Sequence, residues 1–238
     1  MSCQNVFKRY EIKYLITNEQ KQIIKNVMSK YMTGDKYGRN TICNIYFDTP
    51  DFLLIRRSLE HPVYKEKLRL RSYGVAEHDS ETFLEIKKKY NSVVYKRRTE
   101  MTESESMRYL CGGEHIEDNQ IIREIDYFMS YYKNLAPKVF LSYEREAFYA
   151  KDDYDFRVTF DENILWRDYD LSLCKGIYGT PILENNYSLM EIKTGMSIPL
   201  WMTSVLSKNH IYKTSFSKYG NAYTSILEQK IKGEKIYA

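Results

Sequence analysis

The sequence predicts an α+β fold in which antiparallel strands close into a β-barrel with a polar, basic interior and helices packed outside. Several strand-like segments alternate charged with apolar residues, so each strand would have one charged face and one apolar face. Segments with helical periodicity lie between some of these strands and would cover the apolar faces. The charged faces would then meet around a common wet interior.

The clearest alternation places Lys67, Arg69 and Arg71 on one face of a strand, with leucines between them. Three cations at this spacing repel one another unless they face water or a polyanion. Taken alone, this segment is equally well explained as an exposed strand with a basic outer face. The pattern recurs elsewhere, at Arg9, Glu11 and Lys13; Glu85 and Lys87; Lys96 and Arg98; Tyr143 and Arg145; Arg157, Thr159 and Asp161; and Glu191 and Lys193. This recurrence favours the barrel.

Strands are expected wherever two-residue alternation runs between turn residues. Pro50 stops the second strand, and a polar turn from Gly74 to Ser80 follows the basic strand. A hairpin through Asn91 and Ser92 joins the next two strands. The expected strands are residues 6–16, 41–47, 64–73, 82–88, 93–99, 138–149, 154–160, 170–175 and 187–194.

Helices are expected where apolar residues recur at i, i+3 and i+4. Thr17 or Asn18 would cap the first helix, and Gly34 lies in the loop after it. The expected helices are residues 18–31, 51–58 (a helix or turn), 102–110, 119–132, 199–206 and 217–230. Because the chain has no low-complexity linker or internal repeat, we expect one domain over residues 1–238.

Charge and hydropathy exclude several classes of protein. The net charge is only +4, with 36 basic and 32 acidic residues, which does not indicate a nucleic-acid partner. No stretch reaches the ~18 apolar residues that a membrane span needs, and the N-terminus lacks the apolar core of a signal peptide. We therefore expect a cytoplasmic protein, or a cytoplasmic portion of one.

Cysteines and histidines show no metal-ligand spacing. The four cysteines, Cys3, Cys43, Cys111 and Cys174, form no CxxC pair, and the histidines are His61, His78, His115 and His210. The scattered positions predict free thiols in a reducing compartment, and neither a zinc site nor a disulfide scaffold. The histidines are expected to be structural or surface residues.

Crowded cations need counter-charges, because burying an unpaired cation costs several kcal/mol. The carboxylates Glu11, Glu85, Asp161 and Glu191 are fewer than the cations, so an anion of several charges is expected there. A linear triphosphate or polyphosphate fits a line of cations. The carboxylates either hold basic side chains by ion pairs or bind Mg²⁺ or Mn²⁺, with Glu191 the leading metal ligand and Glu11 and Glu85 next.

The charged segments, taken together and in order, resemble the triphosphate tunnel metalloenzymes, and within them the VTC-type polyphosphate polymerase domain. The matching pieces are residues 9–13 (RYEIK), 45–49 (IYFDT), 69–71 (RLR), 84–87 (LEIK), 96–98 (KRR), 143–145 (YER), 157–161 (RVTFD), 190–193 (MEIK) and 217–219 (SKY). Each piece is weak alone, but their order is specific. The resemblance runs from about residue 7 to about residue 223.

The resemblance implies a closed eight-stranded tunnel and transfer of the γ-phosphate of ATP to a growing polyphosphate chain. It implies phosphate binding by Lys13, Arg69, Arg71, Lys87, Lys96, Arg145, Arg157 and Lys218, to which we add Arg98 and Lys193 from the same strand faces. The expected catalytic residues are Lys13, Arg69, Arg71, Lys87, Arg145, Arg157 and Glu191. Glu191 would hold the metal, with Mn²⁺ or Mg²⁺ as the cofactor.

One departure from the family pattern bears on the reaction. The hydrolase branch opens with Glu-x-Glu-x-Lys, whereas Arg9 stands here at the first position, which favours the polymerase branch. The alternatives are a triphosphatase acting on inorganic or organic triphosphate, and a non-catalytic polyphosphate-binding module. Eukaryotic polymerases of the family also carry membrane helices, so any membrane coupling is expected to be absent here or to come from another chain.

Overall fold

The computed structural model describes residues 10–91, 93–114, 119–153 and 155–236. In these residues the chain forms six α-helices and 11 strands. The chain divides into two compact units. Unit 1 contains Met1–Thr41, Tyr143–Ile164 and Leu183–Phe216, and unit 2 contains Ile42–Ser142, Leu165–Ile182 and Ser217–Ala238. The expectation of a single domain over residues 1–238 stays a prediction.

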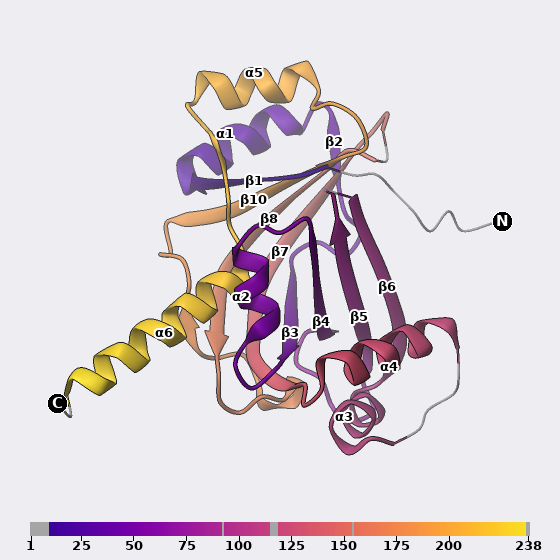
Figure 1. Cartoon of the computed structure of the whole chain (residues 1–238). Helices are drawn as coiled ribbons and strands as arrows, with labels where there is room; N and C mark the ends of the chain where they lie inside the picture. The colour runs from indigo at the N-terminus through magenta and orange to yellow at the C-terminus, as the bar shows by residue number, and fades with distance from the viewer. Residues whose placement is uncertain (1–9, 92, 115–118, 154, 237–238) are drawn as a thin grey trace. The chain divides into compact units, whose positions relative to one another are not determined.

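Unit 1 contains a sheet with two helices on one face (Figure 1). Its elements are β1 (Tyr10–Thr17), α1 (Asn18–Met28), β2 (Met32–Gly34), β10 (Tyr187–Thr194), α5 (Leu200–Lys208) and β11 (Lys213–Thr214), with the later part of β7 (Ala136–Ala150) and most of β8 (Arg157–Arg167). The strand order is β11-β1-β10-β8-β7, and β2 pairs with β7. The β1–β10 and β10–β8 pairings are antiparallel.

The helices of unit 1 form because their ends are capped and their apolar faces are buried. The Thr17 hydroxyl accepts a hydrogen bond from Gln20 N, and the Gln20 side chain accepts one from Thr17 N, which completes a capping box. Ile24 of α1 and Met202 of α5 are fully buried in one apolar cluster with Ile192 of β10. The apolar face of this sheet is therefore covered, and its charged face is the other one.

Unit 2 contains the strand order β7-β3-β4-β5-β6, with α3 and α4 on its apolar face. Its strands are β3 (Asn40–Asp48), β4 (Tyr64–Tyr73), β5 (Glu81–Tyr90), β6 (Val93–Thr102), the first part of β7, and β9 (Thr180–Pro181), which pairs with the end of β8. Its helices are α2 (Leu53–Leu59), α3 (Glu103–Gly112), α4 (Gln120–Tyr132) and α6 (Lys218–Ile236), with the 3₁₀ turn η1 (Leu173–Lys175). Leu68, Leu70, Leu84 and Ile86 are buried under these helices. The predicted alternation is confirmed here.

The prediction of a closed eight-stranded barrel is wrong. The paired strands form an open ladder that runs from β11 at one end to β6 at the other. In the residues that the structure describes, no pairing joins β6 to β1 or β11. The fold is a mixed α/β arrangement with an open, antiparallel sheet. The sequence pattern could not reveal this, because two-residue alternation fixes which face of a strand is charged but not which strands pair.

The strand expected at residues 170–175 is also absent: a 3₁₀ turn, Leu173–Lys175, lies there. The cause is Arg167, which is 1% exposed and donates hydrogen bonds to the carbonyl oxygens of Asp170, Ser172, Gly176 and Tyr178. These bonds fold the segment around the Arg167 guanidinium, so the carbonyl oxygens of the segment do not pair with a neighbouring strand. The starts of the strands expected at 6–16 and 154–160, and Ser92 of the predicted hairpin, lie outside the described residues.

Two further expectations concern cysteines and membrane spans. Cys43, Cys111 and Cys174 are free thiols, as predicted, while Cys3 and His115 lie outside the described residues. Among the helices in the described part of the chain, none has both the length and the apolar composition required to span a bilayer.

Candidate functional site

The charged side of unit 2 is a grid of side chains on β4, β5 and β6, which we call the basic face. Its members are Lys67, Arg69 and Arg71 on β4, Glu85 and Lys87 on β5, and Lys96 and Arg98 on β6. The register puts them in rows across the strands: Arg69 lies opposite Glu85, which lies opposite Arg98. Six predicted site residues, including Glu85 but not Lys67, therefore come from three neighbouring strands, because residues two apart on a strand share a face.

Glu85 is the carboxylate around which the basic face is arranged. It is 1% exposed, and its Oε2 accepts hydrogen bonds from Arg69, with both Nε and an Nη atom at 2.6 Å. Its Oε1 forms an ion pair with Lys96, and Arg71 Nε lies 4.0 Å from Oε2. Although burial opposes ionisation, these cations hold the pKa of Glu85 well below its usual range. Glu85 is therefore a permanent counter-charge that fixes basic side chains in place.

A second row contains only lysines. Lys67 lies opposite Lys87, and Lys87 lies opposite Lys96. Directly opposed like charges destabilise a sheet, so this row favours an anion in front of it. Burial lowers the pKa of Lys96 to about 8, and although Glu85 opposes this shift, Arg69 and Arg71 add to it. Keeping Lys96 protonated in this buried position beside two arginines therefore costs free energy, and a bound anion would offset that cost.

Two residues that the sequence analysis did not select, Asn44 and Tyr46, fix the orientation of the arginines of β4 through hydrogen bonds. Arg69 Nη1 donates a hydrogen bond to Tyr46 Oη at 3.2 Å, and Arg71 Nε donates one to Asn44 Oδ1 at 3.0 Å. Asn44 and Tyr46 lie two apart on β3, directly opposite Arg71 and Arg69. Burial raises the pKa of Tyr46, but the cations outweigh burial and bring it to about 8. Their two-residue spacing was a signal that could have identified them.

The N-terminus of α6 lies beside Lys67. The Ser217 hydroxyl caps this helix by accepting a hydrogen bond from Gly220 N at 3.1 Å, and Lys67 Nζ lies 3.5 Å from the same oxygen. Lys218 is the first residue of α6. Its neighbour Tyr219 stacks on Tyr46 with ring centroids 4.7 Å apart. A capped helix N-terminus carries partial positive charge, which adds to the attraction of this region for anions.

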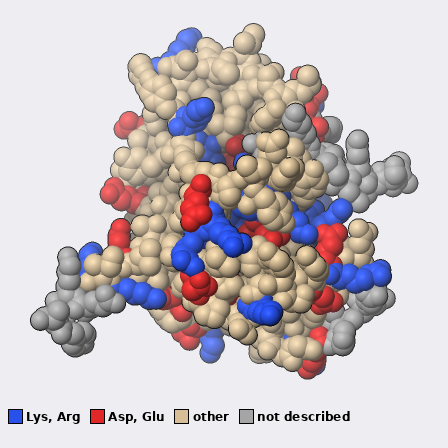
Figure 2. Space-filling view, viewed as in Figure 1, with Lys and Arg blue, Asp and Glu red and all other residues tan. Residues whose placement is uncertain are grey.

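The charged side of unit 1, which we call the mixed face, contains both signs of charge. Its rows place Glu11 opposite Lys193 and Lys193 opposite Arg157, and beside them Lys13 opposite Glu191 and Glu191 opposite Thr159. The Lys193 ammonium lies 3.0 Å from Glu191 Oε1 and 4.0 Å from Glu11 Oε1. Figure 2 shows that lysine and arginine side chains are interspersed with acidic ones on the face in view.

Arg145 and Asp161 form the most buried ion pair of the mixed face. Arg145 donates to both carboxylate oxygens, with Nε 2.6 Å from Oδ1 and an Nη atom 2.8 Å from Oδ2. Asp161 is fully buried. Burial lowers the pKa of Arg145, but the Asp161 carboxylate outweighs burial and raises that pKa well above its usual value. The pair therefore fixes the orientation of Arg145, whose guanidinium also lies 5.2 Å from the Tyr143 ring centroid.

The mixed face also offers oxygen ligands suited to a divalent cation. Glu191 is 7% exposed, and Glu11 lies on the next strand. The Thr159 hydroxyl is buried, lies across from Glu191 and has no hydrogen-bond partner among the described residues. Mg²⁺ and Mn²⁺ prefer such hard oxygen donors. The donors fit a metal at Glu191, whereas Glu85 is already enclosed by three cations.

The structure divides the predicted site residues between the two units. The basic face and the α6 terminus contain Arg69, Arg71, Lys87, Lys96, Arg98, Glu85 and Lys218. The mixed face contains Lys13, Arg145, Arg157, Lys193, Glu191 and Glu11. Arg9, on which the choice between family branches depended, lies outside the described residues.

Comparisons with known proteins agree on the fold. A family model described as the VTC domain matches residues 8–227. A candidate adenylate cyclase from Vibrio parahaemolyticus superposes with a TM-score of 0.51 at 12% identity, covering 92% of this chain and 99% of that one. A candidate adenylate cyclase from Bacillus halodurans has a TM-score of 0.55 at 13% identity, covering 90% and 94%. No match was found among curated proteins.

A third solved structure carries a described activity. It is a candidate adenylyl cyclase from Hippeastrum for which a dominant triphosphatase activity is stated, with a TM-score of 0.55 at 14% identity, covering 90% of this chain and 95% of that one. At such identities the likeness concerns the fold alone.

Proposed function

The chain belongs to the VTC domain family, and from this premise we propose that it is a metal-dependent enzyme that transfers the γ-phosphate of ATP to a growing polyphosphate chain. The observation that carries the proposal is the lysine row Lys67–Lys87–Lys96 beside the arginines that surround Glu85. Opposed cations on three strands are stable when a linear polyanion lies across them.

The residues of the basic face would bind phosphate oxygens in two ways. The planar guanidinium groups of Arg69 and Arg71, fixed by Glu85, Tyr46 and Asn44, would donate paired hydrogen bonds. The lysines Lys67, Lys87 and Lys96 would act as point charges along the chain of phosphates. Because the arginines are already held by neighbours, little side-chain freedom is lost when phosphate binds.

On the mixed face, Glu191, Glu11 and the Thr159 hydroxyl would hold the divalent cation. A bound Mg²⁺ or Mn²⁺ supplies charge neutralisation of the phosphoryl oxygens. Lys13, Lys193, Arg145 and Arg157 would orient the phosphoryl group and stabilise charge that develops on it. Glu85 would position cations and not bind the metal, because its oxygens already face Arg69 and Lys96. Phosphoryl transfer of this kind needs no covalent protein intermediate.

A triphosphatase is the second candidate function. It is supported by the Hippeastrum protein, which has this fold and a stated triphosphatase activity. The basic face would bind tripolyphosphate or a nucleoside triphosphate, and water would replace the polyphosphate acceptor.

Incubation with ATP and Mn²⁺ should yield ADP and polyphosphate in proportion, because each transfer adds one phosphate to the polymer. The measurement is chain length by gel electrophoresis, together with ADP and orthophosphate release. Orthophosphate from tripolyphosphate without chain growth would favour the triphosphatase. Absence of turnover with both substrates, with binding retained, would indicate a polyphosphate-binding module.

Tripolyphosphate affinity should fall as the pH rises through 8. The pKa of Lys96 is about 8, so its charge is present below that pH and lost above it. Tyr46, with a pKa also about 8, gains negative charge over the same range and acts in the same direction. We expect affinity to fall about tenfold, or ~1.4 kcal/mol, between pH 7 and pH 9.5.

Calorimetry on the wild type and on the double variant Lys96→Arg, Tyr46→Phe measures this effect. The variant keeps the positive charge and has no phenol to ionise, so its affinity should change less with pH than that of the wild type. The protonation of tripolyphosphate also changes over this pH range, but that change affects both proteins equally. Equal pH profiles would contradict the assigned roles of Lys96 and Tyr46.

A further inference from the structure

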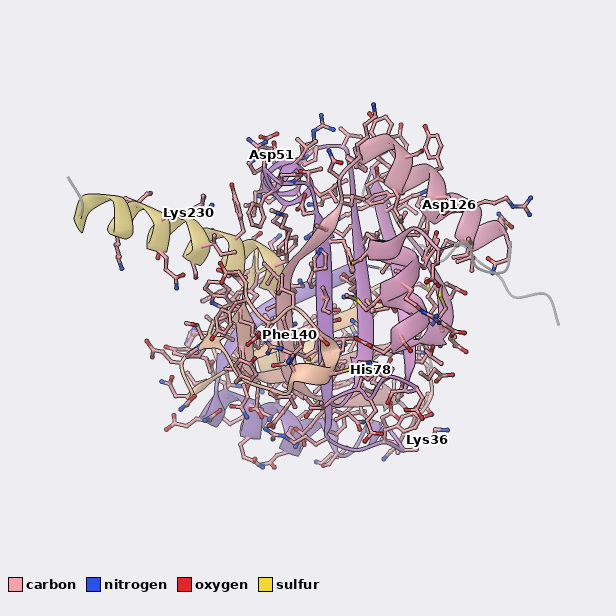
Figure 3. The ribbon with its side chains drawn as sticks, turned by 90° about the horizontal axis from the view of Figure 1, so that it is seen from below. Lys36, Asp51, His78, Asp126, Phe140 and Lys230 are labelled. Atoms are coloured by element: carbon pink, nitrogen blue, oxygen red, sulfur yellow. The ribbon has the colours of Figure 1, made fainter. Side chains whose placement is uncertain are left out.

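Three side chains of different chemistry converge in unit 2, apart from the basic face. His78 lies in the loop between β4 and β5 (labelled in Figure 3), Glu103 is the first residue of α3, and Cys174 lies in η1. Their ligand atoms all lie within 4.8 Å of one another. His78 Nδ1 is 3.4 Å from Glu103 Oε2. Glu103 is 3% exposed, so a carboxylate is buried next to an imidazole and a thiol.

Backbone hydrogen bonds hold the three segments together. Ser104 donates to the His78 carbonyl oxygen through both its backbone N, at 3.0 Å, and its hydroxyl, at 2.8 Å. Glu103 N donates to the Ser80 carbonyl oxygen at 2.9 Å. Ala76 N, in the same loop as His78, donates to the Leu173 carbonyl oxygen of η1 at 3.1 Å. The backbone therefore brings the three ligands close together, and their proximity does not depend on side-chain rotamers alone.

We propose that His78, Glu103 and Cys174 bind a single Zn²⁺ ion. Nitrogen, oxygen and sulfur donors together are the set that zinc accepts in tetrahedral sites. Ligand atoms ~2.0–2.3 Å from a tetrahedral ion lie about 3.3–3.6 Å apart. The His78–Glu103 distance of 3.4 Å already meets this spacing, and Cys174 Sγ lies no more than 4.8 Å from either ligand atom. Water would complete the coordination.

The ion would tie the β4–β5 loop to α3 and η1. Those two strands carry Arg69, Arg71 and Glu85, so zinc would stabilise the strand pair that presents the basic face. This role is distinct from the divalent cation proposed at Glu191. The spacing of cysteines and histidines in the sequence did not indicate this cluster, because its three donors come from segments far apart in the chain.

Two metal-free explanations compete with this assignment. His78 and Glu103 would form a simple ion pair, with Cys174 merely adjacent. Alternatively, Cys174 would be a reactive thiol that binds no metal, which the Co²⁺ titration below distinguishes. A bound Zn²⁺ would hold the Cys174 thiolate directly and displace its proton.

Cobalt titration of the metal-free full-length chain tests the proposal. Co²⁺ substitutes for zinc and gives a near-ultraviolet thiolate charge-transfer band. We expect one Co²⁺ per chain with that band, its displacement by Zn²⁺, and a melting temperature raised by Zn²⁺ but not by Mg²⁺. Cys174→Ser should abolish the band, and His78→Ala should weaken Co²⁺ binding at least about tenfold.

Two matched variants serve as controls: Cys111→Ser removes an exposed thiol, and His61→Ala removes an exposed histidine. Both should bind Co²⁺ as the wild type does. His78 has a side chain that is 84% exposed, so His78→Ala will fold and tests the site even if Cys174→Ser does not. A band that persists in Cys174→Ser, or Co²⁺ affinity unchanged in His78→Ala, would overturn the proposal.

Discussion

Replacing Glu191 by glutamine should lower metal-dependent turnover of ATP or tripolyphosphate by at least about 100-fold. The substitution preserves shape but removes the charge that would hold a divalent cation, and loss of a metal ligand has effects of this size. Lys193, whose ammonium is 3.0 Å from Glu191, would lose its nearest carboxylate as well. Turnover should therefore fall through lost Mn²⁺ affinity and through an altered position of Lys193.

Mn²⁺ titration and turnover, measured on the same samples, separate these effects. Glu11→Gln, on the neighbouring strand, should weaken Mn²⁺ binding less, because Glu11 is the more exposed carboxylate of the two. Glu100→Gln is the matched control, since this residue is 52% exposed at its side chain and pairs with Arg98 on β6. Unchanged Mn²⁺ affinity and turnover in Glu191→Gln would refute the assignment of Glu191 as a metal ligand.

Glu85→Gln should destabilise the ligand-free protein by about 3–5 kcal/mol, because it leaves buried cations without their counter-charge. Glu85 is 1% exposed and faces Arg69, Lys96 and Arg71. Because its pKa is held low in the folded state, its contribution is fully present at neutral pH and is lost as the pH falls below its unfolded-state value. The measurement is urea unfolding at pH 7.

Tripolyphosphate should reverse much of this loss, since an anion on the basic face supplies the missing negative charge. The rise in melting temperature on adding tripolyphosphate should be larger for Glu85→Gln than for the wild type. Glu100→Gln removes an exposed carboxylate from the same strand system and should alter stability by less than ~1 kcal/mol. A destabilised Glu85→Gln protein that tripolyphosphate does not rescue would argue against phosphate binding at the basic face.

Local features of the fold were predictable because they depend on neighbouring residues. Thr17, Thr102 and Asn119 each cap a helix near its expected start, and alternation identified the apolar faces of β4 and β5 correctly. Closure of the sheet was not predictable, because it depends on which distant strands pair. The strand expected at residues 170–175 failed for a different reason: the nearby Arg167 donates hydrogen bonds to carbonyl oxygens in and around this segment, and alternation does not indicate such contacts.

In the candidate site, too, the face of each strand was predictable from the sequence, but the contacts between strands were not. Spacing placed Lys67, Arg69 and Arg71 on one side of β4, but only the register reveals that Glu85 faces Arg69. Asn44 and Tyr46 were overlooked because neutral residues do not stand out in a search for charge. Their importance follows from the hydrogen bonds that they make to the arginines.

The open ladder leaves β6 with β5 as its only strand neighbour among the described residues. A long edge with free peptide groups invites a second copy of the chain to add its own strand. Here Lys96 and Arg98 lie in the middle of that edge, and an antiparallel pairing centred on Arg97 would place each Lys96 directly opposite Arg98 of the other copy. The same lysines and arginines that favour phosphate thus discourage self-association into fibrils, and a polyphosphate bound along them would weaken that protection.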